Sequence, residues 1–509
     1  MTESPSLVLR RARLVPLPGR AAEPAADLGG RGLVDVRVEG GRIASVTPSG
    51  TGTGEGASEV VDLDGRWLMP GLWDAHVHMA QWALARRRLD VSEAASAAEV
   101  ARAVVDELRR TPVPDGGALV AAGFRDGLWP DVPTAELLDR AVVDAGLPPV
   151  PVVVVSADLH CAWFSSTALA EVGVDHPTGL LRETEWMPLM AQVDRAPEVA
   201  LDAWVDDAAA AAARLGVVGI VDLEIADNVA AWYRRAAARP LRLRVDAALW
   251  PEHLDAAIER GLASGAWVTP DGLVRVGPFK VIADGSLNTR TAFCHEPYPP
   301  VTDGVAWTGA LNVEPEHLAE QMTRAARHGI RCAIHAIGDH ANAVVLDAFE
   351  ATGARGSIEH AQLLTPDDVT RMAALGVVAS VQPEHALDDR DVADVHWAGR
   401  TGRSFAYGDL ARAGVTMTFG SDAPVARLDP WAAIAAAVTR ARDGREPWHP
   451  EQAVNLGTAL ASSVRSRVTP GEPADLVVLD AEPVPDGDLL RAMPVAATML
   501  AGAWTHRAL

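Results

Sequence analysis

The chain has 509 residues, of which 49% are hydrophobic and 22% are charged, which is the composition of a globular protein with a large core. Its formal net charge of −23 disfavours a nucleic-acid partner, because binding to a polyanion needs a basic face. The sequence has no run of about 18 apolar residues and no signal-peptide pattern at its start, so we expect a cytoplasmic protein with no part in a membrane.

Short strands are predicted at both ends of the chain. Apolar runs separated by turns rich in Gly, Pro and Ala stand at residues 7–15, 33–39, 42–47 and 60–63, and similar runs follow at 476–479 and 496–500. Two β-rich ends around a long middle indicate that the termini pair with each other. We therefore predict a small β-sandwich domain made of residues 1–66 and 466–509, and a main domain at residues 67–465.

The middle of the chain alternates between apolar strand-like runs and Ala-rich helical stretches, which favours a parallel α/β fold. Eight strands are predicted, at residues 68–73, 217–223, 241–249, 274–282, 330–334, 357–358, 377–382 and 416–419. Eight such repeats predict a TIM (β/α)8 barrel. Residues 82–200 exceed what the barrel needs. Because this stretch has apolar runs of its own at 119–124 and 150–156, we interpret it as a lid-like insertion.

Lys280 is the only lysine of the chain, beside 44 arginines. One explanation is chance: a compositional bias that favours arginine over lysine has left one lysine in the chain. The other is chemistry: a guanidinium stays charged, whereas a buried lysine amine can lose its proton. A neutral amine can act as a nucleophile, form a Schiff base, act as a base, or take up CO2 to become a carbamate. Position 280 is therefore a candidate functional position.

Residues with metal-binding chemistry stand at the ends of the predicted strands. In a TIM barrel the carboxyl ends of the strands carry the active site. Two histidines at i and i+2 on an extended chain point to one side and can share a metal ion. Any one such histidine alone is more often a hydrogen-bonded core residue, but a set at one end of one barrel predicts a metal site. The set is His76, His78, Lys280, His335, His360 and Asp422.

Several local phrases extend this pattern over nearly the whole chain. They are the stretches at residues 69–78, 280–287, 289–292, 335–339, 358–361, 419–424 and 470–480, with Asp158-Leu159-His160 in the insertion. The order HxH, Lys, His, His, Asp on successive strands resembles the metal-dependent amidohydrolase superfamily. Within it, these phrases are similar to those of the YtcJ-like amidohydrolases.

The resemblance implies a role for each ligand. His76 and His78 would bind one divalent ion together with Asp422, and His335 and His360 would bind a second. Lys280, as a CO2-derived carbamate, would offer one oxygen to each ion. The family resemblance allows one ion or two. Imidazole with oxygen ligands suits Zn²⁺ best, and Mn²⁺, Fe²⁺ or Co²⁺ would also fit.

The resemblance also implies a metal-dependent hydrolase of small molecules. Metal-activated water would cleave the C–N bond of an amide, formamide or cyclic amide, with Asp422 taking the proton from water and returning it to the leaving amine. An ester or lactone hydrolase, or a deaminase, would use the same site, and the sequence does not separate these alternatives. A barrel that serves only as a scaffold is disfavoured, because all six ligand positions are kept.

Weaker candidates surround this set. His160 either reaches from the insertion to hold the substrate carbonyl or has a structural role. Arg290 either binds substrate or pairs with Asp284, for which we favour a structural role. Trp129 lines an apolar substrate pocket or simply packs. A small-molecule substrate is the expected partner, and a homodimer is the default expectation.

Overall fold

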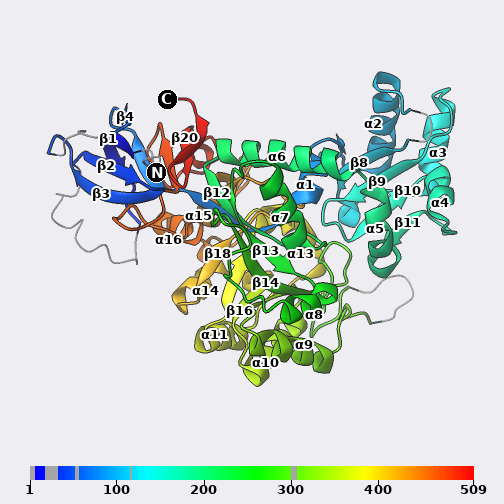
Figure 1. Cartoon of the computed structure of the whole chain (residues 1–509). Coiled ribbons are helices and arrows are strands. Elements are labelled where there is room, and N and C mark those ends of the chain that lie inside the picture. Colours follow the sequence, from blue (N-terminus) through cyan, green and yellow to red (C-terminus); the bar gives the residue numbers. More distant parts are fainter. Residues whose placement is uncertain (1–5, 18–31, 52–56, 115–116, 300–305) are drawn as a thin grey trace.

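The protein consists of a central barrel, an inserted lobe and a sheet domain built from both termini (Figure 1). The computed structural model describes residues 6–17, 32–51, 57–114, 117–299 and 306–509. Parts of the predicted segments 1–66 and 82–200 therefore lie outside the described residues. In Figure 1 the terminal domain (blue and red) and the inserted lobe (cyan) lie at opposite ends of the molecule, with the barrel between them.

The barrel is an eight-stranded parallel sheet in the order β18-β17-β16-β15-β14-β13-β12-β6. Its first and last strands meet where the Asp422 N–H donates to the His76 carbonyl at 2.7 Å and the His78 N–H donates to the Ala423 carbonyl at 2.9 Å. The strands are β6 (Leu72–Val77), β12 (Val217–Asp222), β13 (Arg244–Leu249), β14 (Val274–Ile282), β15 (Cys332–Ala336), β16 (Gly356–His360), β17 (Val378–Val381) and β18 (Met417–Phe419).

Helices alternate with these strands along the chain, and their apolar faces contribute to one large core. They are α1 (Met79–Ala85), α6 (Glu198–Arg214), α7 (Asn228–Ala238), α8 (Pro251–Glu259), α9 (Pro315–Arg327), α10 (Asp339–Thr352), α11 (Pro366–Leu375), α12 (His385–Asp388), α13 (Arg390–His396), α14 (Tyr407–Arg412), α15 (Pro430–Thr439) and α16 (Leu456–Ser462). Alternating strands and helices around a parallel sheet confirm the predicted TIM barrel.

The predicted first barrel strand at 68–73 is wrong as a single strand. The structure has β5 (Trp67–Pro70), which pairs with the terminal sheet, and then β6, which begins the barrel. Gly71 lies between the two strands, where the backbone passes close to β12. A Cβ atom at this position would lie 2.2 Å from a side-chain carbon of Val218. Only glycine lets the backbone pass that close to β12.

The terminal domain is a mixed sheet in which both chain ends take part, as predicted. Its order is β21-β20-β19-β5-β1-β2-β3, with β4 also pairing β1, so that β1 belongs to two layers around one apolar core. Besides β5, its strands are β1 (Ser6–Leu14), β2 (Val34–Glu39), β3 (Arg42–Pro48), β4 (Glu59–Asp62), β19 (Leu476–Leu479), β20 (Val495–Leu500) and β21 (Ala503–Arg507). Helix α17 (Gly487–Arg491) lies between β19 and β20 in the sequence and packs against α15 of the barrel.

The insertion has a five-stranded sheet of its own in the order β11-β10-β9-β8-β7, with helices and two apolar clusters. Its elements are β7 (Leu89–Asp90), α2 (Ala97–Arg110), β8 (Leu119–Phe124), α3 (Ala135–Asp144), β9 (Val152–Ser156), β10 (Cys161–Phe164), α4 (Ser166–Val172), β11 (Leu180–Arg182) and α5 (Met187–Val193). It is thus a lobe with its own core.

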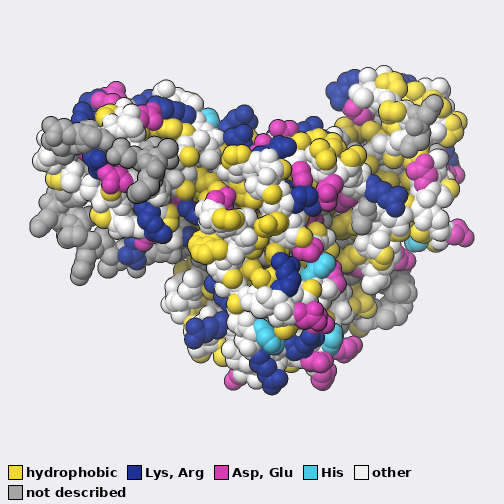
Figure 2. Space-filling view, viewed as in Figure 1, with side chains coloured by type: hydrophobic (Ala, Val, Ile, Leu, Met, Phe, Trp, Pro, Cys, Tyr) yellow, Lys and Arg dark blue, Asp and Glu magenta, His cyan; other side chains and the backbone are white. Residues whose placement is uncertain are grey.

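The surface carries charges of both signs. On the face shown in Figure 2, Lys and Arg side chains are interspersed with Asp and Glu. Within the described residues, no helix combines the length and the apolar character that crossing a membrane requires.

Candidate active site

A pocket lies at the carboxyl ends of the barrel strands. Side chains of both the barrel and the insertion line it. The pocket brings together most of the predicted site residues, with one further histidine: His78, His160, Lys280, His335, His360, His385 and Asp422. His76 is buried beside it.

Asp422 is the centre of the cluster. Its Oδ1 lies 3.2 Å from the Nε2 atom of His76 and 3.4 Å from the Nε2 atom of His78. Burial alone would raise the pKa of Asp422, but the neighbouring imidazoles outweigh burial and hold that pKa well below its usual value. The carboxylate form is therefore the stable one. Buried Asp74 shapes this corner, because its Oδ1 accepts the N–H groups of His76 and Ser421.

Three of the histidines have one ring nitrogen held by a neighbour. His76 Nδ1 lies 2.7 Å from Oε2 of Glu359, and His360 Nδ1 lies 2.8 Å from Oε1 of Gln382. His335 is held through Nε2, which lies 3.4 Å from the Gly285 carbonyl oxygen. In each ring the other nitrogen is left for a ligand, as in proteins whose metal-binding histidines are oriented by a second hydrogen bond.

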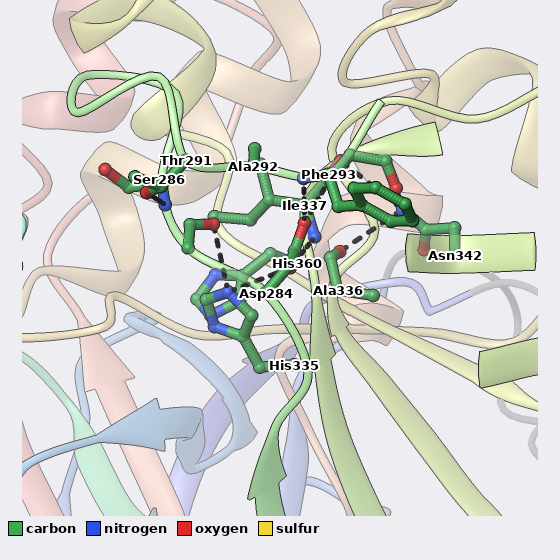
Figure 3. Close-up of polar contacts among 12 residues, drawn as sticks. Asp284, Ser286, Thr291, Ala292, Phe293, His335, Ala336, Ile337, Asn342 and His360 are labelled. Atoms are coloured by element: carbon green, nitrogen blue, oxygen red, sulfur yellow. Dashed lines mark hydrogen bonds and ion pairs between the residues drawn. The ribbon is translucent and has the colours of Figure 1, made fainter. Parts of the chain in front are cut away.

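Asp284 supports His335 and the loop after β14. Its carboxylate accepts the backbone N–H groups of Phe293, Ile337 and Gly338 at 2.8, 3.0 and 2.9 Å, and Oδ1 lies 3.4 Å from His335 Nε2 (Figure 3). Each of these contacts is to backbone or to a histidine of the cluster. This agrees with the structural role favoured for Asp284.

Lys280 is buried on β14, with 1% of its surface exposed. Burial lowers the pKa of its amine, and the attraction of Glu359 and Asp422 does not restore the ordinary value. A buried amine with a lowered pKa is more readily neutral, and only the neutral form can react with CO2. The environment therefore suits the carbamate that the resemblance implies.

His160 reaches the pocket from the insertion. Its Nδ1 lies 2.9 Å from Oε2 of Glu183, whose other oxygen accepts the hydroxyls of Thr289 and Thr291 at 3.0 and 2.6 Å. Burial lowers the pKa of His160, but Glu183 and Asp158 outweigh it and raise that pKa to about 9. The His160 ring, whose centre is 6.1 Å from that of His335, is thus a cation next to the histidine cluster.

Two predicted substrate residues do not line the pocket. Trp129 packs on Phe124 in the core of the insertion, with ring centres 5.6 Å apart. Arg290 follows β14, and its carbonyl accepts the indole N–H of Trp307 at 2.6 Å. Their substrate-binding roles stay predictions that the pocket geometry does not favour.

Sequence analysis missed His385, Glu359 and Gln382. His385 begins α12, and its Nε2 lies 3.9 Å from Oδ2 of Asp422. A signal existed, because Gln382-Pro383-Glu384-His385 follows the seventh strand as the other histidines follow theirs. Glu359 and Gln382 each contact the Nδ1 atom of a histidine, His76 and His360 respectively. The members of each pair are far apart in the sequence, so only the folded structure shows the contacts.

The residues present fit a divalent metal ion. Two groups, His76/His78/Asp422 and His360/His385/Asp422, each place their potential ligand atoms within 4.8 Å of one another. Among the described residues, buried His78 Nδ1 and His385 Nε2 have no hydrogen-bond partner. Imidazoles around a carboxylate form a donor set typical of zinc and similar ions.

Comparison with known proteins identifies the family. The model of the amidohydrolase family matches residues 59–503, which is most of the chain. The chain belongs to the amidohydrolase family. This makes it a hydrolase, and it confirms the resemblance found in the sequence.

Relatives match over most of their length. Putative amidohydrolase YtcJ of Bacillus subtilis is 27% identical, covering 84% of this chain and 87% of its own. Protein LONG AFTER FAR-RED 3 of Arabidopsis thaliana is 28% identical, with 84% and 80% covered. N-substituted formamide deformylase of Arthrobacter pascens is 26% identical, with 88% and 90% covered.

A solved structure agrees on the fold. An uncharacterized metal-dependent hydrolase from Pyrococcus horikoshii superposes with a TM-score of 0.76 at 23% identity, covering 94% of this chain and 98% of that one. The same fold therefore occurs over nearly the whole length of another protein.

Proposed function

We propose that this amidohydrolase cleaves the C–N bond of an amide, formamide or cyclic amide with water activated at its histidine cluster. The observation that carries the proposal is the position of Asp422, an ionised carboxylate 3.2 and 3.4 Å from two imidazole nitrogens and facing the pocket. The similarity to an N-substituted formamide deformylase over 88% of the chain supports this bond type.

The proposed reaction requires one or two bound divalent ions, with Zn²⁺ as the first choice. His76, His78 and Asp422 would hold one ion, His335 and His360 a second, and a carbamate on Lys280 would join them. When bound, such ions lower the pKa of water toward neutrality and polarise the substrate carbonyl.

Two side chains of the pocket then have separate roles: Asp422 moves the proton, and His160 stabilises the charge on the carbonyl oxygen. Water adds its oxygen to the carbonyl carbon, the carbonyl π pair moves to the carbonyl oxygen, and the Asp422 carboxylate accepts the proton released from water. Asp422 returns this proton to the nitrogen as the C–N bond breaks, so that an acid and an amine leave. His160, kept protonated by Glu183, donates a hydrogen bond from Nε2 to the carbonyl oxygen.

The rest of the pocket favours an apolar substituent on the substrate. Met187 and Met190 of α5, together with Leu159 and Ile225, form an apolar side of the pocket. Methionine side chains adapt to irregular shapes, so this wall suits varied N-substituents. The partner is accordingly a small molecule. The proposal also includes a cytoplasmic location and a homodimer. Light scattering tests the oligomeric state.

A substrate screen tests the proposed reaction. Protein loaded with Zn²⁺ or Mn²⁺ is assayed for amine release from N-substituted formamides, other amides and cyclic amides, beside esters, lactones and amino-heterocycles. We expect turnover of at least one amide class, and a kcat lower by about 10²–10⁴-fold in Asp422→Asn. Ester cleavage alone, or ammonia release from amino-heterocycles alone, would replace this reaction with one of the alternatives.

A further inference from the structure

His385 is a buried histidine of the pocket to which the family resemblance gives no role. It begins α12, just after β17, and 5% of its surface is exposed. Its Nε2 has no hydrogen-bond partner among the described residues and lies 3.9 Å from Oδ2 of Asp422. Buried polar atoms are nearly always paired in folded proteins, so an unpaired one that lines a pocket indicates a partner supplied by a ligand.

The metal ligands implied by the resemblance do not include this residue, although its ring is near enough to His360 and Asp422 to share an ion with them. Under the proposed function His76, His78 and Asp422 would hold one ion, His335 and His360 would hold a second, and a carbamate on Lys280 would serve both. Catalytic metal sites keep one coordination position open for water or substrate. A further imidazole on the ion would fill that position.

The arrangement of the rings places His385 next to the histidines that would hold the ions. The ring centres of His160 and His335 are 6.1 Å apart, those of His335 and His360 4.5 Å, and those of His360 and His385 6.2 Å. His160 and His385 thus stand at the two ends of a row whose middle members are expected metal ligands. The His385 end is the one close to Asp422, where water gives up its proton under the proposed mechanism.

We infer that His385 is a further catalytic residue, whose Nε2–H donates a hydrogen bond to an oxygen of the tetrahedral species formed when water adds to the substrate carbonyl. The inference rests on the proposed function. Nε2 of His385 lies beside Asp422 without a partner among the described residues, so a proton carried on this nitrogen is free to be donated to a ligand oxygen. A donor held in place before the reaction costs no reorganisation when charge develops on the oxygen.

Binding of methylphosphonate tests the inference without a known substrate. This anion has a tetrahedral centre with oxygens like those of the reacting species. Titration calorimetry compares Zn²⁺-loaded parent protein with His385→Ala and His385→Gln, and metal content per chain is measured for each. His396→Gln is the matched control, because His396 is also buried with an unpartnered Nδ1 but does not line the pocket.

We expect His385→Ala to bind methylphosphonate at least about tenfold more weakly with unchanged metal content, since a hydrogen bond to a charged group is lost. His385→Gln keeps an N–H donor and should recover part of the affinity, and His396→Gln should bind like the parent. Equal affinity in parent and His385→Ala would overturn the inference. So would a loss of metal in both His385 variants, which would make His385 a ligand, or a metal-loaded parent that does not bind the anion. If the expected pattern appears in a protein that cleaves no amide, the inference holds and the proposed C–N reaction fails.

Discussion

Lys280 extends from β14 into the pocket, and it is the single lysine of the chain. This makes its carbamate directly observable. We expect protein loaded with metal in ¹³C-bicarbonate to show one slowly exchanging carbamate signal in its ¹³C NMR spectrum, because no other lysine can contribute one. The signal should be absent from Lys280→Met. A metal-loaded parent without any such signal would remove the bridging role from Lys280.

Glu359 is expected to set metal affinity through His76. Its Oε2 accepts from His76 Nδ1 at 2.7 Å, which orients the ring with Nε2 facing Asp422. In Glu359→Gln the amide can donate to Nδ1 instead, which favours the wrong tautomer. Loss of such an outer partner weakens metal binding by about 10–100-fold.

Competition with a fluorescent chelator measures this affinity. Asp202→Asn is the control, because Asp202 pairs with Arg234 and Arg235 away from the cluster and should leave metal binding unchanged. Parent-like affinity in Glu359→Gln would mean that Glu359 does not orient His76.

At the residue scale, the sequence predicted those site residues whose position follows directly from the end of a barrel strand. The expected ligands lie together because the carboxyl ends of parallel strands meet at one end of a barrel; they include His76, Lys280 and His335. Gln382 and Glu359 were not predicted, because their role is to contact one particular ring nitrogen of a histidine, and the sequence does not show such contacts. Trp129 was a candidate for the pocket wall by its residue type, with simple packing as the alternative, and its position depends on how the insertion folds internally.

At the scale of elements, the loop after β14 depends on Asp284. Its carboxylate is fully buried and accepts three backbone N–H groups, from Phe293, Ile337 and Gly338, so that it joins this loop to the end of β15 (Figure 3). Asp284→Ala leaves these donors unpaired, and each buried unpaired donor costs about 1–3 kcal/mol. We therefore expect the free energy of unfolding to fall by at least about 3 kcal/mol.

Urea denaturation measures this loss, and metal content reports on His335 in the same variant. Asp284→Asn keeps one acceptor oxygen and should lose less stability than Asp284→Ala. If Asp284→Ala is as stable as the parent, the loop is held by other contacts.

The elements themselves were largely predictable, since the barrel strands are buried apolar runs of the expected length. The exception at 68–73 has a physical cause: β5 and β6 form one apolar run, and only contacts with β19 and β12 divide it between two sheets. The sheet of the insertion was not predicted either. Two of its strands, β7 and β11, have two and three residues, too few to show a period.

At the scale of the whole molecule, the terminal sheet is bound to the barrel by a buried ion pair. Arg244 at the start of β13 donates to both oxygens of Asp475 at 2.5 and 3.0 Å, with side chains 15% and 5% exposed. Asp475 Oδ1 also accepts the Ala501 N–H at 2.8 Å. One carboxylate therefore joins β13 of the barrel to the chain at the end of β20.

Asp475→Asn should destabilise both parts together. Removing one partner leaves the charge of Arg244 buried without compensation, which costs about 3–5 kcal/mol. Urea unfolding followed by hydrogen exchange should show earlier opening of β13 and of β19–β20 at one shared midpoint. Asp62→Asn is the control: its pair with Arg11 is 52% and 44% exposed, and such surface pairs contribute about 0–1 kcal/mol. If the terminal strands open first in Asp475→Asn while the barrel keeps its parental midpoint, the two parts are stable independently and the ion pair only docks them.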